Sequence, residues 1–152
     1  MPAAPKPVRK KKTKKKKTIT RSVKTKRIKK RLHDLWSKLV RHRDKACVLC
    51  GESEKVLNAH HWIVNAGRSL SVRFCLGNGV TLCYSCHIFK VHQTAAAVYT
   101  DKIRDYMIPD HISMDDFNRI TVLAEERSDF TLEDLEVLEA AFKRLWERTK
   151  NS

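Results

Sequence analysis

Four cysteines in two Cys-x-x-Cys pairs are the residues of this chain whose spacing most directly predicts chemistry. Cys47 is paired with Cys50 and Cys83 with Cys86, and 32 residues separate the two pairs. Each pair can place two thiolates on one tight turn, and four thiolates are a common ligand set for structural zinc. We therefore expect a Zn²⁺ site that holds the fold together. The alternative is four unrelated buried cysteines.

A second group of side chains that bind metals or transfer protons lies between the pairs and just after them. It consists of the doublet His60-His61, then Asn78, then His87, which follows the second pair directly. Imidazole ligates divalent metals and exchanges protons near neutral pH, so this group predicts a site with its own chemistry. His92 lies five residues after His87, which on an α-helix turns it ~140° away, so a ligand role requires the helix to stop first.

Disulfide bonds are a weaker interpretation of the cysteines. The chain opens with MPAAPKPVRKKK, which contains no apolar signal segment, and no later stretch reaches the ~20 apolar residues of a membrane span. We therefore expect a cytoplasmic protein with reduced thiols and no membrane partner. The fifth cysteine, Cys75, is interpreted as a packing residue, with a fifth ligand or a reactive thiol as alternatives.

Positive charge is concentrated at the N-terminal end. Residues 1–45 hold 20 of the 32 Lys and Arg against two aspartates, and the rest of the chain is net acidic. The lysine run lacks periodic apolar residues, which predicts a disordered tail over residues 1–27 that is attracted to polyanions. Nucleic acid is the expected partner, because such tails release counterions from phosphates. A solubilising or targeting tail is the alternative.

Apolar periodicity indicates the elements that must position these side chains. An amphipathic helix is expected from Ile28 to about Arg43, where apolar residues recur at three- and four-residue steps. Short strands are expected near 56–63 and 72–76, followed by a turn at 77–79. A helix starting near the second cysteine pair would complete a ββα plan, which places the chain in the α+β class.

The remainder of the chain is predicted to be helical. Helices are expected over 93–106 and 115–127, with a break at 108–110, and Thr131 with Asp134 resembles the N-terminal cap of a last helix. That helix carries an apolar stripe made of Leu135, Leu138, Phe142, Leu145 and Trp146. The stripe packs on the core or forms a homodimer interface.

The stretch from about 39 to 92 resembles the HNH endonuclease family. The resemblance rests on the order and spacing of HHWI at 60–63, GNGVTLC at 77–83 and CHIFK at 86–90. The segments at 41–44 and 68–74 look like those of the phage Rap/NinG recombination nucleases. That branch would have Gly-His and Cys-Asn where this chain has His60-His61 and Cys86-His87, so the active centre is closer to the general HNH type.

The resemblance implies a role for each residue of the second group. His61 would be the general base, Asn78 would fix its orientation, and His60 and His87 would hold a divalent cation, Mg²⁺, Mn²⁺ or another transition metal, with His92 as a further candidate ligand. Adjacent strand residues face opposite ways, so the two histidines share one centre only if the strand bends or ends there. Their roles could be exchanged, or one could be an ordinary packed histidine.

Three basic residues are candidates for holding the substrate phosphates. Arg68 and Arg73 flank the site in the sequence, and Lys90 lies three positions after His87; solvated surface side chains are the alternative for all three. The resemblance implies cleavage of DNA to products with a 5′-phosphate and a 3′-hydroxyl, on branched or recombining phage DNA in the Rap branch and hence in a host cytoplasm.

Two hypotheses about function follow. The first is a metal-dependent DNA endonuclease with a basic tail at 1–27, a nuclease domain at 28–107 and a helical extension at 108–152. The second is a non-catalytic zinc-stabilised protein that binds DNA or acts as an adaptor, in which the cysteines and the tail suffice. The presence of His61, Asn78 and His87 at this spacing favours the enzyme, because a binding module does not need all three.

Overall fold

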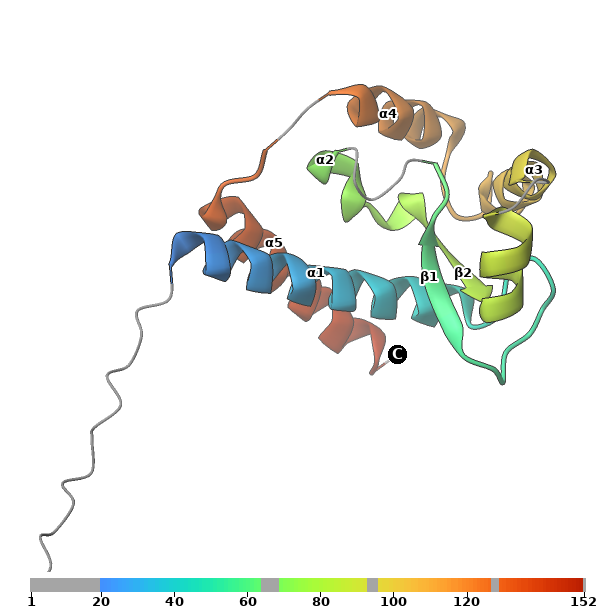
Figure 1. The fold of residues 1–152 in the computed structure, drawn as a ribbon, viewed down its shortest axis with the longest axis horizontal. Helices are drawn as coiled ribbons and strands as arrows, with labels where there is room; N and C mark the ends of the chain where they lie inside the picture. Colours follow the sequence, from blue (N-terminus) through green and yellow to red (C-terminus); the bar gives the residue numbers. More distant parts are fainter. Residues whose placement is uncertain (1–19, 64–68, 93–95, 127–128, 152) are drawn as a thin grey trace, which may run out of the picture.

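The computed structural model describes residues 20–63, 69–92, 96–126 and 129–151 (Figure 1). Two antiparallel strands are followed by helices in the chain, and a long N-terminal helix runs beside the C-terminal one, so the α+β class is confirmed. The disordered tail was predicted over residues 1–27, and residues 1–19 of it lie outside the described residues, as do the loop residues 64–68.

Helix α1 (Arg21–Asp44) is the longest element and begins inside the segment that we assigned to the tail. Lys and Arg are good helix formers, so nothing in residues 21–27 stops the helix from extending towards the N-terminus. The helix ends where Lys45 adopts a left-handed conformation (φ 61°) and its N–H donates to the carbonyl of Arg41. Its buried stripe is the one predicted: Ile28, Leu32, Trp36, Leu39 and Val40.

The sheet consists of β1 (Leu57–His61) and β2 (Gly79–Cys83), paired from Leu57 opposite Cys83 to His61 opposite Gly79. The first strand lies where we predicted it. The second does not, because the segment predicted as a strand at 72–76 begins in the last two residues of the short helix α2 (Leu70–Arg73) and ends in the first residue of a 3₁₀ turn, η1 (Leu76–Asn78).

Side-chain hydrogen bonds explain why residues 72–76 do not need a partner strand. Three backbone carbonyls of this segment accept hydrogen bonds from side chains of other elements. The pairs are Asn78 Nδ2 to Val72 at 3.3 Å, His61 Nε2 to Arg73 at 2.8 Å and Trp36 Nε1 to Cys75 at 3.0 Å. Backbone polar groups satisfied in this way are freed from the sheet ladder. The alternation of apolar residues was therefore misleading over so short a run.

Gly79 sets how closely β2 approaches α1. A Cβ atom at this position would lie 2.6 Å from Cζ2 of Trp36 and 2.6 Å from Cγ2 of Val40. Both are side chains of the core that are 0% exposed, so neither can move aside cheaply. Only glycine lets the strand carry Val80 and Leu82 into the core at this separation from the helix.

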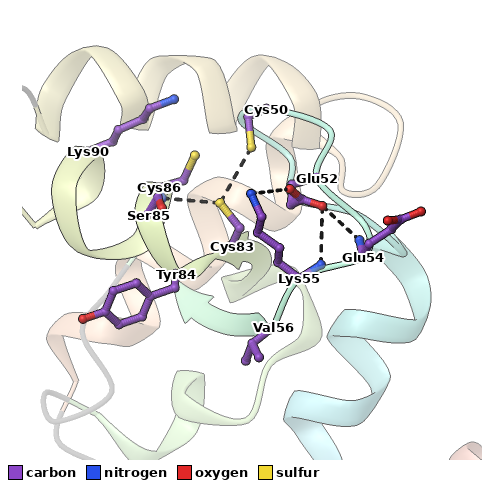
Figure 2. Close-up of a pocket in the computed structure, with 10 residues that line it drawn as sticks. All are labelled: Cys50, Glu52, Glu54, Lys55, Val56, Cys83, Tyr84, Ser85, Cys86 and Lys90. Atoms are coloured by element: carbon purple, nitrogen blue, oxygen red, sulfur yellow. Dashed lines mark hydrogen bonds and ion pairs between the residues drawn. The ribbon is translucent and has the colours of Figure 1, made fainter.

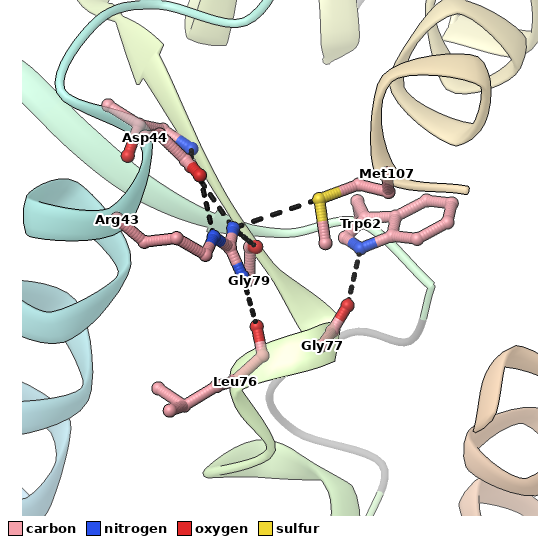
Figure 3. Close-up of polar contacts among 8 residues, drawn as sticks. Arg43, Asp44, Trp62, Leu76, Gly77, Gly79 and Met107 are labelled. Carbon is pink, nitrogen blue, oxygen red and sulfur yellow. Dashed lines mark hydrogen bonds and ion pairs between the residues drawn. The ribbon is translucent and has the colours of Figure 1, made fainter. Parts of the chain in front are cut away.

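A polar junction ties the end of α1 to β2 (Figure 3). The Arg43 guanidinium donates to the carbonyls of Leu76 at 3.0 Å and Gly79 at 2.6 Å, and pairs with Asp44 at 2.6 Å. Asp44 in turn accepts the N–H of Thr81 at 2.7 Å, and its side chain is 0% exposed. A buried carboxylate is tolerated here because it is paired and hydrogen-bonded.

The helices that follow the sheet match the predicted pattern. After the π-helical segment η2 (Cys86–Val91) come α3 (Ala96–Met107), α4 (Met114–Glu125) and α5 (Leu132–Thr149). Thr131 and Asp134 form the expected capping box of α5, with backbone and side-chain hydrogen bonds in both directions. None of the helices in the described ranges is long and apolar enough to span a membrane.

Helix α5 lies along α1, and the predicted apolar stripe packs on the core (Figure 1). Leu135 and Phe142 are buried with the α1 stripe, and Leu138 and Trp146 pack against them. Leu145 is more exposed, at 38%. A second cluster surrounds the cysteines and joins β2 to α3 through Val80, Leu82, Ile103 and Met107. The cysteine pairs are thus part of a core and not a surface appendage.

The ion pair between Arg31 and Glu139 is expected to make folding sensitive to acid. Both carboxylate oxygens of Glu139 accept hydrogen bonds from Arg31 at 2.8 Å, which lowers the pKa of Glu139 from 4.5 to about 2. A lowered folded-state pKa stabilises the fold above about pH 4.5, and this contribution is lost as the pH falls towards 2. Because Arg31 is half exposed, we expect Glu139→Gln to lower the free energy of unfolding by about 1–2 kcal/mol at pH 7.

Urea unfolding of the parent and the variant across this pH range measures the effect. Glu136→Gln, at an exposed position of the same helix, is the control. The parent and the control should lose stability together below pH 4.5, whereas the Glu139 variant should depend less on pH. Equal pH dependence of all three proteins would contradict the assignment.

Candidate metal centres and the histidine site

The four cysteines converge from two tight turns as predicted, and Figure 2 shows three of them, Cys50, Cys83 and Cys86. Gly51, with φ 75°, closes the first turn, and its N–H donates to the carbonyl of Cys47 at 2.8 Å. The four sulfur atoms lie within 4.8 Å of one another, and Cys50 Sγ is 3.7 Å from Cys83 Sγ. Zn–S bonds of about 2.3 Å place neighbouring sulfurs about 3.8 Å apart in a tetrahedron. The cluster therefore has the size of a structural zinc site.

The pKa shifts of Cys47, Cys50 and Cys86 also fit a metal site. All five cysteines of the chain are free thiols, which excludes the disulfide interpretation in this structure. Burial raises the pKa of Cys47 and raises that of Cys86 to about 12, whereas a backbone N–H at Glu52 lowers that of the exposed Cys50 to about 7. The buried thiols of Cys47 and Cys86 therefore lose their protons readily only when a cation takes the place of the proton.

Cys75 is separate from this cluster. It packs against Val72, Ile120 and Ala124, so its interpretation as a packing residue is confirmed. It precedes the 3₁₀ turn η1 rather than lying in a strand, and its carbonyl accepts the indole N–H of Trp36 at 3.0 Å.

Three histidines form a second group that could hold a metal ion. His60 Nδ1 lies 3.1 Å from His87 Nε2, which lies 3.2 Å from His92 Nε2. Zn–N bonds of about 2.0–2.1 Å place neighbouring nitrogens about 3.3–3.4 Å apart, so one ion can reach all three. A proton on His87 Nε2 can be donated to only one of its two neighbours, whereas a cation satisfies all three lone pairs.

The π-helical segment η2 brings His92 to the site. In a π-helix the backbone hydrogen bonds join residues five apart, so residues five apart lie close together on one face. The segment ends at Val91 and His92 follows as its C-cap. We expected His92 to be a ligand only if the α-helix stopped before it. The structure meets this condition in another way, because the segment is a π-helix and ends just before His92. Such short π segments are common at functional sites.

Burial keeps His60 neutral. Its side chain comes from β1 and is 9% exposed. Burial and then the charges of His87, His92 and His61 lower the pKa of His60 to about 3. At neutral pH the ring therefore keeps a free lone pair, which is the form that ligates metals. The pKa of His87 is lowered for the same first reason, burial.

His61 faces away from the triad, towards α1 and α2. Its ring stacks on Trp36 with centroids 4.1 Å apart and planes 10° from parallel, and its Nε2 lies 2.8 Å from the carbonyl of Arg73. Because a carbonyl only accepts, Nε2 carries the proton and Nδ1 keeps the lone pair. Burial, followed by the charges of His33 and Arg73, lowers the pKa of His61, so the ring is neutral at pH 7.

Strand β1 ends at His61, which is the condition that we set for the doublet to share one centre. The two side chains leave opposite faces of the strand, as alternation requires. They nevertheless interact, because the charge of His61 contributes to the lowered pKa of His60. The end of β1 therefore carries one imidazole of the triad on one face and the His61 imidazole on the other.

Asn78 joins the segments on either side of His61. It is 0% exposed; its Oδ1 accepts the N–H of Ile63 at 2.9 Å, and its Nδ2 donates to the carbonyl of Val72 at 3.3 Å. The first bond holds the chain just after β1, and the second holds the helix α2 that carries Arg73. The amide thus supports both the strand and the carbonyl that orient the His61 ring.

Replacing Asn78 with alanine is expected to lower the free energy of unfolding by about 1–3 kcal/mol, because the N–H of Ile63 loses its acceptor. Thermal unfolding of the parent and the variant measures this loss. Asn118→Ala, at an exposed position of α4, is the control. If Asn78→Ala unfolded at the same temperature as the parent and Asn118→Ala, the hydrogen bonds of Asn78 would contribute nothing to stability.

The structure places two of the three candidate phosphate-binding residues. Arg73 lies beside His61 and His33, since its charge lowers the pKa of both. Lys90 lies instead at the cysteine cluster, where it lines a hollow of about 620 Å³ with Lys55 and Tyr84 (Figure 2). Its ammonium group is 5.6 Å from the Tyr99 ring. Arg68 lies outside the described residues.

Two residues next to His61 were missed by the sequence analysis. Trp36 was read only as a core residue, and His33 was not considered. The two rings stack with centroids 5.5 Å apart, and His33 lies 6.1 Å from His61. The sequence did contain a sign of this contact: His33 and Trp36 are three positions apart and therefore share a helix face.

The findings support a ββα-like arrangement that carries a four-cysteine cluster and a histidine triad. Comparison with protein-family models, with curated proteins and with solved structures returned no match.

Proposed function

We propose that this chain is a metal-dependent DNA endonuclease of the HNH type. One observation carries the proposal: the triad of His60, His87 and His92 lies at the same strand end as His61, whose protonated Nε2 leaves Nδ1 as a proton acceptor. Phosphodiester hydrolysis requires both a cation at the phosphate and a base for water. A purely structural metal site would have no use for the second imidazole.

His61 is the general base in this proposal. It removes a proton from the attacking water through Nδ1, and the carbonyl of Arg73 stabilises the imidazolium that forms, because Nε2–H then donates more strongly to it. Stacking on Trp36 holds the plane of the ring, so the base does not reorient between turnovers. Asn78 acts as a positioning residue through the segments that it joins.

The triad supplies the cation site. A divalent ion bound there would neutralise charge on the phosphate and on the leaving oxygen. Within the described residues the group contains three imidazoles and no carboxylate, a ligand set that favours a transition metal over Mg²⁺. Three protein ligands also leave coordination positions for substrate, as a catalytic site requires.

DNA is the proposed substrate because of the charge of the chain. The net charge is +15, and 20 of the 32 Lys and Arg precede residue 46. On α1 the side chains of Lys24, Lys26, Arg27 and Lys30 are exposed. A positive helix next to the histidines would hold a polyanionic backbone without reading its sequence.

Nicking of supercoiled plasmid in the presence of Mg²⁺, Mn²⁺, Co²⁺, Ni²⁺ or Zn²⁺ tests the proposal. His87→Ala should lose both cleavage and one equivalent of bound metal, with the other equivalent retained by the cysteines. His111→Ala, at an exposed position after α3, is the control. The absence of cleavage by the parent with every metal would reject the enzyme and favour the zinc-stabilised binding protein. Comparing linear duplex, single strand and four-way junction then defines the preferred substrate.

A further inference from the structure

We infer that Arg73, with His33 and Arg41 of α1, forms a phosphate-binding subsite next to His61, on the side away from the metal-binding triad. The inference builds on the proposed nuclease by stating where the substrate strand lies. It assigns roles to two α1 residues, His33 and Arg41, that are absent from the sequence-based candidates. The ligand is a phosphodiester of the strand being cut, adjacent to the reacting one.

The first observation is an arginine without a counter-ion. In the described part of the chain, the guanidinium of Arg73 has no hydrogen-bond or ion-pair partner, and its Nε is buried. Its contact is with the Phe74 ring, 5.7 Å from Cζ. A buried guanidinium nitrogen without an acceptor is costly, so the position is explained best by an anion that arrives with a ligand.

The second observation is the excess of positive charge at that arginine and the neighbouring face of α1. The charge of Arg73 lowers the pKa of both His61 and His33, and Arg41 also lowers that of His33. Asp34 is the acidic side chain that acts on His33 in the opposite direction. Two arginines, Arg73 and Arg41, therefore act on one neutral histidine, with Asp34 as the opposing carboxylate among these groups, and their field attracts a phosphate.

The third observation is the orientation of the α1 side chains. His33, Ser37 and Arg41 are spaced by four residues and therefore form one row on the helix, and Arg41 donates to Ser37 Oγ at 2.5 Å. His33 Nδ1 is buried without a partner, so a proton there would have no acceptor. The neutral ring therefore carries its proton on Nε2, which makes this atom a donor.

The stacked rings connect this row to the reaction centre. His33, Trp36 and His61 follow one another, with planes within 24° of parallel. His60 lies on the opposite face of β1 with the triad. In this inference the reacting phosphate lies at the end of β1, between the triad and His61, and the next phosphate lies on the His61 side, beside Arg73 and His33. Binding at the subsite would determine which phosphate of the strand lies at the reaction centre.

Salt dependence of DNA binding tests the subsite without requiring cleavage. A short duplex is titrated at several salt concentrations, with no Mg²⁺ or Mn²⁺ added. Arg73→Gln should reduce the slope of log K against log salt by about 0.9, the value for one lost phosphate contact, and Arg73→Lys should restore it. His33→Leu should weaken binding about fivefold without changing the slope, because a neutral donor releases no counter-ion.

Matched controls separate the subsite from general charge effects. Arg144→Gln removes the same charge from the exposed face of α5, and His42→Leu removes an exposed histidine of α1 that packs edge-on against Trp146. Both controls should bind DNA as the parent does. Equal slopes for Arg73→Gln and Arg144→Gln, or no measurable binding of DNA by the parent, would overturn the inference.

The two proposals fail separately. Cleavage by the parent combined with an unchanged slope in Arg73→Gln rejects the subsite and leaves the nuclease. A reduced slope combined with no cleavage under any metal rejects the nuclease and leaves a phosphate-binding site. Thermal unfolding of Arg73→Gln and Arg73→Lys is the check on folding. Both variants place a polar side chain without a partner at position 73, so if they are equally stable, a difference in their salt slopes reflects the charge alone.

Discussion

Replacing Cys47 with serine is expected to release zinc and to unfold the region around β2. Structural zinc contributes about 10–16 kcal/mol of apparent binding free energy, which is as large as the whole stability of a typical domain. Cys47 is 2% exposed and belongs to the same core cluster as Val80, Leu82 and Ile103, so losing the metal also loosens that core. Zinc content by atomic emission, together with circular dichroism on heating, measures both effects.

The fifth cysteine provides the control for this experiment. Cys75→Ser changes a half-buried thiol that lies outside the cluster, so this variant should keep the zinc content of the parent and lose little stability. Removing metal from the parent with a chelator should reproduce the behaviour of the Cys47 variant. A Cys47 variant with full zinc content and unchanged unfolding would mean that the four cysteines do not hold the ion.

The second large effect is expected at His61. His61→Ala should lower the rate of DNA cleavage by about 10²–10⁴-fold, the usual contribution of a general base. The variant should still bind metal, because the triad consists of other residues, and it should still bind DNA. Single-turnover cleavage, metal stoichiometry and DNA affinity measured on one preparation separate catalysis from binding.

The pH profile of cleavage provides an independent test of this role. Burial lowers the pKa of His61 from 6.5, so the ring stays neutral and active at pH 6.5 and is protonated only at lower pH. The acidic limb of the profile should therefore lie below pH 6.5. A limb above that value, or a His61→Ala variant that cleaves at the parental rate, would remove His61 from the mechanism and favour another base.

The sequence by itself determined the features that depend on short-range spacing. Two thiolates on one tight turn are specified by a pair of cysteines three positions apart, and Gly51 closes the first turn whatever the rest of the chain does. The stripe of α1 and the capping box at Thr131 are also local, since helix periodicity and caps involve residues within one or two turns. These predictions needed no knowledge of distant contacts.

Tertiary structure decided the features that depend on which distant groups satisfy the backbone. Residues 72–76 alternate like a strand, yet their carbonyls accept bonds from Asn78, His61 and Trp36, so β2 forms at 79–83 instead. His92 reaches the triad because η2 widens into a π-helix, which residue spacing on an α-helix did not predict. Trp36 and His33 became neighbours of His61 only when α1 packed across the sheet. Local spacing specifies turns and faces, whereas packing selects which of them meet.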